Sequence, residues 1–161
     1  MDVLSTKALI AGLFSWISLH TGYEIPDKAP DVVFASHEKL VELACQDECP
    51  VLGLYHPSHV IYLDIALKPA TNICARAILV HELVHVMQHE NGSFNDVDAH
   101  KRVILRENEA LLVHRNFLRQ HGRGNMFKRN LRLWRAANRA EVREGAKNWR
   151  SPLQTYFERD C

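Results

Sequence analysis

Five residues in the middle of the chain, His81-Glu82-Leu83-Val84-His85, combine side chains that could hold and use a metal ion. On a helix, residues four apart share one face at a separation of about 6 Å, so both imidazoles can reach one ion. Glu82 is placed where its carboxylate can lie beside the ion and accept a proton from water. The spacing therefore predicts a metal site with Glu82 as the general base.

The residues around this motif indicate a buried helix. The spacer and flanking positions are apolar: Leu79, Val80, Leu83, Val84, Val86 and Met87. Burying two imidazoles and a carboxylate costs free energy unless a partner compensates for it, and a divalent cation would do so. The alternative is a helix whose histidines form hydrogen bonds in the core or at its edge.

A catalytic zinc site needs a third protein ligand and an open position for water. The extended motif H-E-x-x-H-x-x-G-x-x-H is absent, because Gln88 and Asn91 stand where it has glycine and histidine. A carboxylate elsewhere in the chain must then complete the site. The minor candidates are Asp96, Asp98 and His100, and for Asp96 and Asp98 a solvated surface is the better interpretation.

The main candidates for the third ligand are Glu107 and Glu109, on a later predicted helix. They are two residues apart, hence about 200° apart around the helix axis, so only one can face the ion. We prefer Glu109, because it shares a stripe with Leu105 and Leu112 and is followed by a small residue, Ala110, that permits close helix approach. Glu107 remains the alternative.

The motif and a later glutamate resemble the gluzincin-type zinc metallopeptidases. Over about residues 13–120 the chain also looks like a small uncharacterised bacterial family of minimal zincin domains. The further residues that carry this likeness are Thr21-Gly22-Tyr23, Gly53-Leu54-Tyr55, Ile61-Tyr62-Leu63 and Glu107-x-Glu109-Ala110. The resemblance implies Zn²⁺ held by His81, His85 and Glu109, with Glu82 as the general base of peptide-bond hydrolysis. It implies no particular peptide or protein substrate.

The predicted elements that position these residues belong to one α+β domain over residues 1–122. Cap and turn signals predict helices at 3–19, 36–45, 72–90 and 99–120, and strands at 31–35, 51–55 and 60–64. The last two strands form a hairpin around His56-Pro57-Ser58-His59. We therefore expect a mostly helical, minimal zincin-like domain with a small antiparallel sheet and the motif on its active-site helix.

In enzymes of the kind that the chain resembles, the strand before the motif helix commonly lies at a sheet edge. The resemblance therefore implies that strand 60–64 lies at an edge, where an extended peptide could add as a further strand. A tyrosine or histidine near the metal would then stabilise the oxyanion of the substrate. No motif identifies this donor. The candidates are Tyr55, His59, Tyr62, His89 and His114.

Basic charge is concentrated near the C-terminus. Residues 1–114 hold 8 Lys and Arg against 15 Asp and Glu, whereas residues 115–161 hold 12 against 4. Residues 123–161 are predicted to form a basic amphipathic helix, at about 125–149, and a tail that packs on the same domain. An anionic partner, nucleic acid or an acidic protein surface, is the alternative role of its arginines.

The 161 residues are 47% hydrophobic, which suits one domain with a core and excludes a disordered chain. The four cysteines, too few for a disulfide scaffold, are Cys45, Cys49, Cys74 and Cys161. Cys45 and Cys49 are interpreted as ordinary thiols or a local disulfide. The apolar stretch 8–19 is too short to span a bilayer and lacks an export cleavage site, which favours a packed helix and a cytoplasmic location.

Three functions fit these patterns. The preferred one is a zinc-dependent metallopeptidase. The second is a zinc-holding, non-catalytic binding or regulatory module that acts through the basic C-terminal helix. The third is another metal-assisted amide hydrolase, such as a deformylase, although the other segments typical of deformylases are missing.

Overall fold

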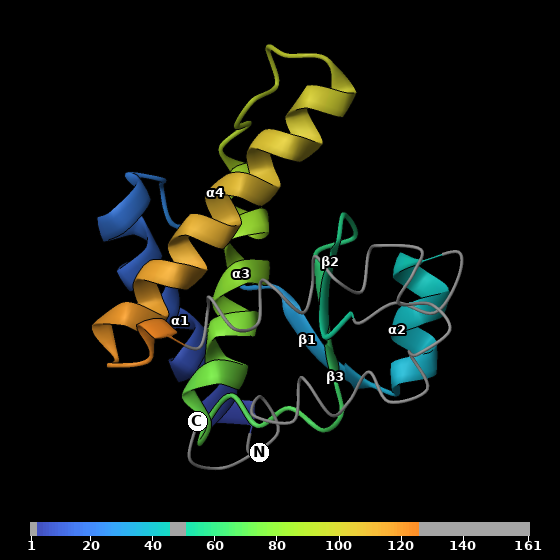
Figure 1. Ribbon diagram of the computed structural model, residues 1–161, viewed down its shortest axis with the longest axis vertical. Coiled ribbons are helices and arrows are strands. Elements are labelled where there is room, and N and C mark those ends of the chain that lie inside the picture. The colour runs from blue at the N-terminus through green and yellow to red at the C-terminus, as the bar shows by residue number, and fades with distance from the viewer. Residues whose placement is uncertain (1–2, 46–50, 126–161) are drawn as a thin grey trace.

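The computed structural model describes residues 3–45 and 51–125. Its elements are α1 (Val3–Thr21), β1 (Asp31–Ala35), α2 (His37–Ala44), β2 (Gly53–His56), β3 (Val60–Asp64), α3 (Ile73–Glu90) and α4 (Ala99–Gln120). The expected α+β class is confirmed. The sheet lies between α2 on one side and α1, α3 and α4 on the other (Figure 1). Residues 126–161, with most of the predicted basic helix and tail, lie outside the described residues.

The three strands form a mixed sheet in the order β1-β3-β2. β2 and β3 are antiparallel, as the hairpin predicts, but β1 runs parallel to β3. The expected antiparallel pairing is therefore confirmed for β2 and β3, whereas the small sheet as a whole is mixed. The crossover through α2 allows β1 and β3 to point the same way, which a short hairpin loop could not do. The expectation that residues 60–64 form an edge strand is wrong, because β3 lies in the centre and β2 at an edge.

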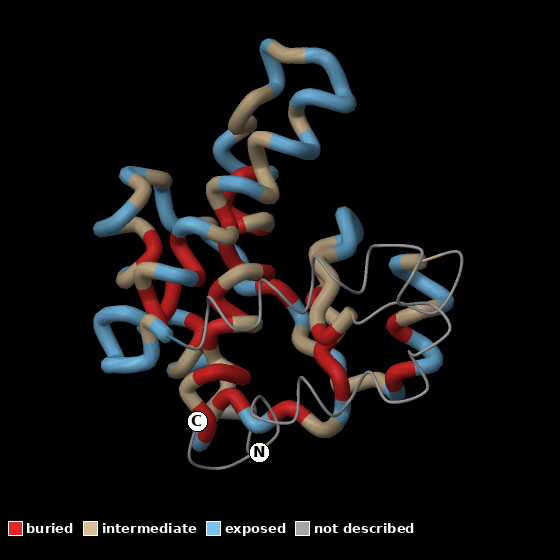
Figure 2. The backbone as a smooth tube through the Cα atoms, viewed as in Figure 1, coloured by how far each residue is buried: buried red, intermediate tan, exposed pale blue. Residues whose placement is uncertain are grey.

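Helix α3 forms the centre of the core. The Asn72 side chain caps its start by accepting a hydrogen bond from the Ala75 N–H, and Gly92 follows its end with a φ of +63°. Val80, Leu83 and Val84 on this helix are fully buried. Buried residues follow α3, whereas the outer end of the α3–α4 connection is largely exposed (Figure 2). A helix buried on most of its surface leaves only a narrow strip for polar side chains.

Two further sequence expectations concern the cysteines and the membrane. Cys45 and Cys74 are each disulfide-bonded, so neither is an ordinary thiol. Cys49, the expected local partner of Cys45, lies outside the described residues. In the described part of the chain, no helix has both the length and the apolar character of a membrane span.

Candidate metal centre

Helices α3 and α4 bring His81, His85 and Glu107 together. His85 Nε2 lies 3.1 Å from His81 Nε2. The Glu107 carboxylate oxygens lie 3.4 Å from His81 Nε2 and 3.1 Å from His85 Nε2. Among residues 3–45 and 51–125, these three side chains are the one group of His, Cys, Asp and Glu close enough to hold a metal ion. We call them the three-ligand group.

The donor atoms of this group are spaced as ligands of one zinc ion would be. A tetrahedral ion with bonds of about 2.1 Å keeps neighbouring donors about 3.4 Å apart. The measured separations are 3.1 to 3.4 Å. Two imidazole nitrogens and one carboxylate oxygen are a donor set that zinc accepts, and three protein ligands leave a fourth position for water or substrate. The residues present could therefore hold a divalent cation such as zinc and leave one position open.

The third carboxylate differs from the one preferred in the sequence. Glu107 precedes the buried residues Ala110 and His114 by three and seven positions, so it lies on the stripe of α4 that faces the core. Leu112, which supported the choice of Glu109, is 55% exposed. Glu107 therefore replaces Glu109 beside the histidines. No sequence pattern distinguishes Glu107 from Glu109, because the burial of Ala110 and His114 is known only from the fold.

Glu107 and the histidines compensate for one another electrostatically. Burial raises the pKa of the Glu107 carboxyl group, but hydrogen bonds with His81 and His85 outweigh burial and lower the pKa. Burial lowers the pKa of His85, but its hydrogen bond with Glu107 and the charge of Glu82 raise the pKa overall. Without a cation, the raised pKa of His85 favours a proton on its ring, and this proton would partly offset the carboxylate charge. A divalent ion would take the place of this proton.

The Glu82 side chain lies against β2. Its Oε2 accepts a hydrogen bond of 2.8 Å from the backbone N–H of Tyr55. Glu82 is only 6% exposed. Burial raises its pKa, although the charges of His81 and His85 lower it in part. The carboxylate is therefore held between the sheet and the three-ligand group, where it can accept a proton.

Gly53 on β2 permits this close approach. A Cβ atom at position 53 would lie 2.8 Å from Glu82 Oε1 and 2.9 Å from Ile78 Cγ2. We expect Gly53→Ala to destabilise the fold by about 1–3 kcal/mol, because the extra methyl group overpacks the site. Urea unfolding would measure the change.

Gly12 on α1 supplies the matched control. A Cβ atom there would meet nothing within 4 Å. Gly12→Ala should leave the protein as stable as the original or more stable, because alanine favours a helix over glycine. If Gly53→Ala unfolds at the same urea concentration as Gly12→Ala, the close approach of β2 to Glu82 does not require glycine at position 53.

Glu109 lies outside the three-ligand group and accepts hydrogen bonds from two other side chains. Its Oε2 accepts hydrogen bonds from the Tyr23 hydroxyl at 2.6 Å and from Gln88 Nε2 at 2.8 Å. Burial, followed by the hydrogen bond to Glu109, raises the pKa of Tyr23 to about 12, so the hydroxyl keeps its proton. Gln88 in turn lies 2.9 Å from His85 Nδ1. No sequence motif predicts these contacts, although Gln88 lies one turn after His85.

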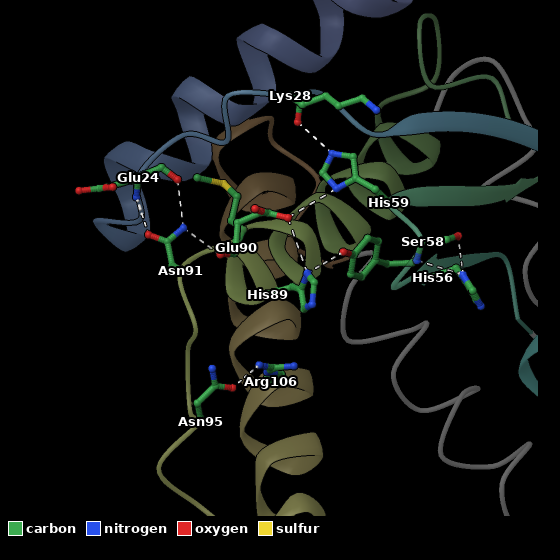
Figure 3. Close-up of polar contacts among 12 residues, drawn as sticks. Glu24, Lys28, His56, Ser58, His59, His89, Glu90, Asn91, Asn95 and Arg106 are labelled. Carbon is green, nitrogen blue, oxygen red and sulfur yellow. Dashed lines mark hydrogen bonds and ion pairs between the residues drawn. The ribbon is translucent and has the colours of Figure 1, made fainter.

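Two of the candidate oxyanion donors contact each other. The Tyr55 hydroxyl lies 3.1 Å from His89 Nδ1. Burial and the charge of Glu90 raise the pKa of Tyr55. Glu90 lies between His89 and His59, at 3.7 and 3.6 Å (Figure 3). Because His89 follows His85 by one helical turn, the Tyr55–His89 pair lies next to the three-ligand group along α3.

The other candidates have different positions. Tyr62 lies on the central strand β3. His114 is 5% exposed, and burial together with the charge of His81 lowers its pKa to about 3, so it is neutral at pH 7. The minor ligand candidates lie outside the three-ligand group: Asp96, Asp98 and His100.

The site as a whole combines a group that can hold a cation with a separate buried carboxylate. Such an arrangement can polarise a carbonyl and activate a water molecule. Comparisons of the chain with protein-family models, with curated proteins and with solved structures found no match.

Proposed function

We propose that the protein is a zinc-dependent peptidase in which His81, His85 and Glu107 bind the metal and Glu82 is the general base. The observation that carries the proposal is the position of Glu82. Its carboxylate is buried, has a raised pKa and is bonded to the backbone of β2. A purely structural metal site would not require such a group beside it.

The residues of the site have separate tasks in this proposal. The ion, when bound, supplies a Lewis acid for the substrate carbonyl and lowers the pKa of water. The Tyr55 N–H orients the Glu82 carboxylate, which accepts a proton from the attacking water and passes it to the leaving amine. The Tyr55–His89 pair is the favoured donor to the oxyanion, because it lies next to the three-ligand group.

A peptide substrate is supported by the outer side of β2, with which no other strand of the described residues pairs. His56 and Leu52 accept backbone hydrogen bonds within the hairpin, so the alternate residues Gly53 and Tyr55 direct their backbone groups away from β3. One of these groups, the Tyr55 N–H, bonds Glu82. An extended peptide that pairs along this edge would therefore pass the general base.

The disulfide bonds of Cys45 and Cys74 indicate the kind of cellular compartment in which the protein acts. Such bonds persist in oxidising compartments and are rare in the cytosol. We therefore favour an oxidising compartment over the cytoplasmic location expected from the sequence. Thiol alkylation of protein taken directly from its source, followed by mass measurement, tests this: full labelling without reduction would contradict it.

The test of function combines metal content with peptide cleavage. The full chain is purified without chelators, its metals are measured by elemental analysis, and it is incubated with a library of unstructured peptides read by mass spectrometry. We expect about one zinc ion per chain, cleavage that a chelator abolishes, and recovery when zinc is added back.

Each other outcome would contradict the proposal in a distinct way. Stoichiometric zinc without cleavage would indicate the non-catalytic metal-holding module. Hydrolysis of small acylated amines but not of peptides would indicate another amide hydrolase. Failure to contain or take up a transition metal would contradict the metal site itself.

A further inference from the structure

The two ring nitrogens of His85 face different partners. Nδ1 lies 2.9 Å from the Oε1 atom of Gln88, and Nε2 faces the other two members of the three-ligand group. An amide oxygen can only accept a hydrogen bond, so Nδ1 must carry a proton. When the imidazole is neutral, this proton leaves the lone pair on Nε2, the atom that faces Glu107 and His81.

The orientation of Gln88 is itself determined by its surroundings. Its Nε2 donates to the backbone oxygen of Arg106 at 3.0 Å and to Glu109 Oε2 at 2.8 Å. A flipped amide would place its oxygen against both acceptors and its nitrogen against the Nδ1–H of His85. Gln88 is 0% exposed, so water does not compete for these bonds. Every polar atom of this buried amide thus has a partner that specifies one orientation.

Glu109 is held from a third part of the chain. The Tyr23 hydroxyl donates to the same Oε2 atom that accepts from Gln88. The segment that carries Tyr23 is fixed in turn by Asn91, whose side chain binds the backbone N–H and C=O of Glu24 at 2.9 and 3.1 Å. Residues from the α1–β1 connection, α3 and α4 thus meet in one chain of hydrogen bonds that ends at His85.

We infer that Tyr23, Glu109 and Gln88 form a positioning relay that fixes the ring orientation and the Nδ1–H form of His85, so that Nε2 faces the metal. The metal in this statement rests on the proposed function, whereas the protonation of Nδ1 does not. Outer partners of metal-bound histidines typically contribute about 10–100-fold to metal affinity. Glu109 thus helps to position the metal ligand His85 but does not bind the metal itself.

Metal affinity tests the relay. Gln88→Leu removes the acceptor for His85 and should raise the dissociation constant for Co²⁺ and Zn²⁺ by about 10–100-fold, measured by competition with a coloured chelator. It should also change the visible absorption of the Co²⁺-loaded protein. Tyr23→Phe should have a smaller effect. Glu109→Leu removes the acceptor oxygen of both neighbours and should weaken metal binding in the same direction as Gln88→Leu.

The matched control is Gln120→Leu, the same substitution on α4 at a residue that contacts Trp16 and His20. It should change neither the affinity nor the Co²⁺ spectrum. Thermal unfolding of each metal-free variant shows whether the fold is retained. The inference is overturned if Gln88→Leu and Gln120→Leu bind Co²⁺ with the same affinity and spectrum.

A measurement without metal separates this inference from the proposed function. In metal-free protein labelled with ¹⁵N-histidine, at a pH above the pKa of His85 so that its ring is neutral, Nδ1 should carry the proton in the original chain, and in Gln88→Leu it should lose this preference. If the protein takes up no metal, the proposed function fails, and the Nδ1 signal still decides whether the relay exists. An unprotonated Nδ1 in the original chain would refute the relay.

Discussion

Glu82→Gln is expected to abolish peptide cleavage while zinc remains bound. Glutamine keeps an oxygen that can accept the Tyr55 N–H, so the local structure should persist. It cannot take a proton from water at neutral pH, and general base catalysis typically contributes about 10²–10⁴-fold to the rate. We therefore expect kcat/KM for a cleaved peptide to fall by at least about 100-fold, with an unchanged dissociation constant for zinc.

The matched control for this substitution is Glu42→Gln on α2, where the carboxylate is exposed and pairs with Lys39. It should leave kcat/KM unchanged. Two results would count against the role of Glu82. Cleavage by Glu82→Gln at the original rate would remove it from the reaction, and loss of zinc would make it part of the metal site.

Glu107→Gln is expected to weaken zinc binding by more than about 100-fold, a larger loss than outer partners of a ligand produce. The carboxylate is the anionic member of the three-ligand group and lies 3.1 and 3.4 Å from the two imidazole nitrogens. Its replacement should also lower the pKa of His85, because the hydrogen bond with Glu107 raises that pKa. Chelator competition and histidine NMR titration measure the two effects.

Glu109→Gln, the same change two residues along α4, is the control that separates the two glutamates. It should retain nearly full zinc affinity, because its oxygen can still accept from Tyr23 and Gln88. The opposite ranking, with zinc lost in Glu109→Gln and kept in Glu107→Gln, would restore the choice made from the sequence and refute the assignment to Glu107.

Local chemistry made most element boundaries predictable. Asn72 and Asp98 cap α3 and α4 through their own side chains, and glycines with positive φ follow both helices. Each signal acts within a few residues, so it can be recognised without the fold. The parallel pairing of β1 with β3 was not predictable in this way, because it depends on how α2 carries the chain across the sheet.

The residues of the site likewise differ in whether local spacing or long-range packing positions them. That His81 and His85 share a face of one helix follows directly from their spacing of four residues. Which carboxylate joins them depends on the rotation of α4 against α3 and on the buried stripe through Ala110 and His114, so it could be read only from the fold. Contacts between segments far apart in the chain leave no periodic pattern in either segment. For the same reason, the sequence does not show that Gly53 and Tyr55 lie beside Glu82. Their contacts with Glu82 depend on the position of β2 at the sheet edge.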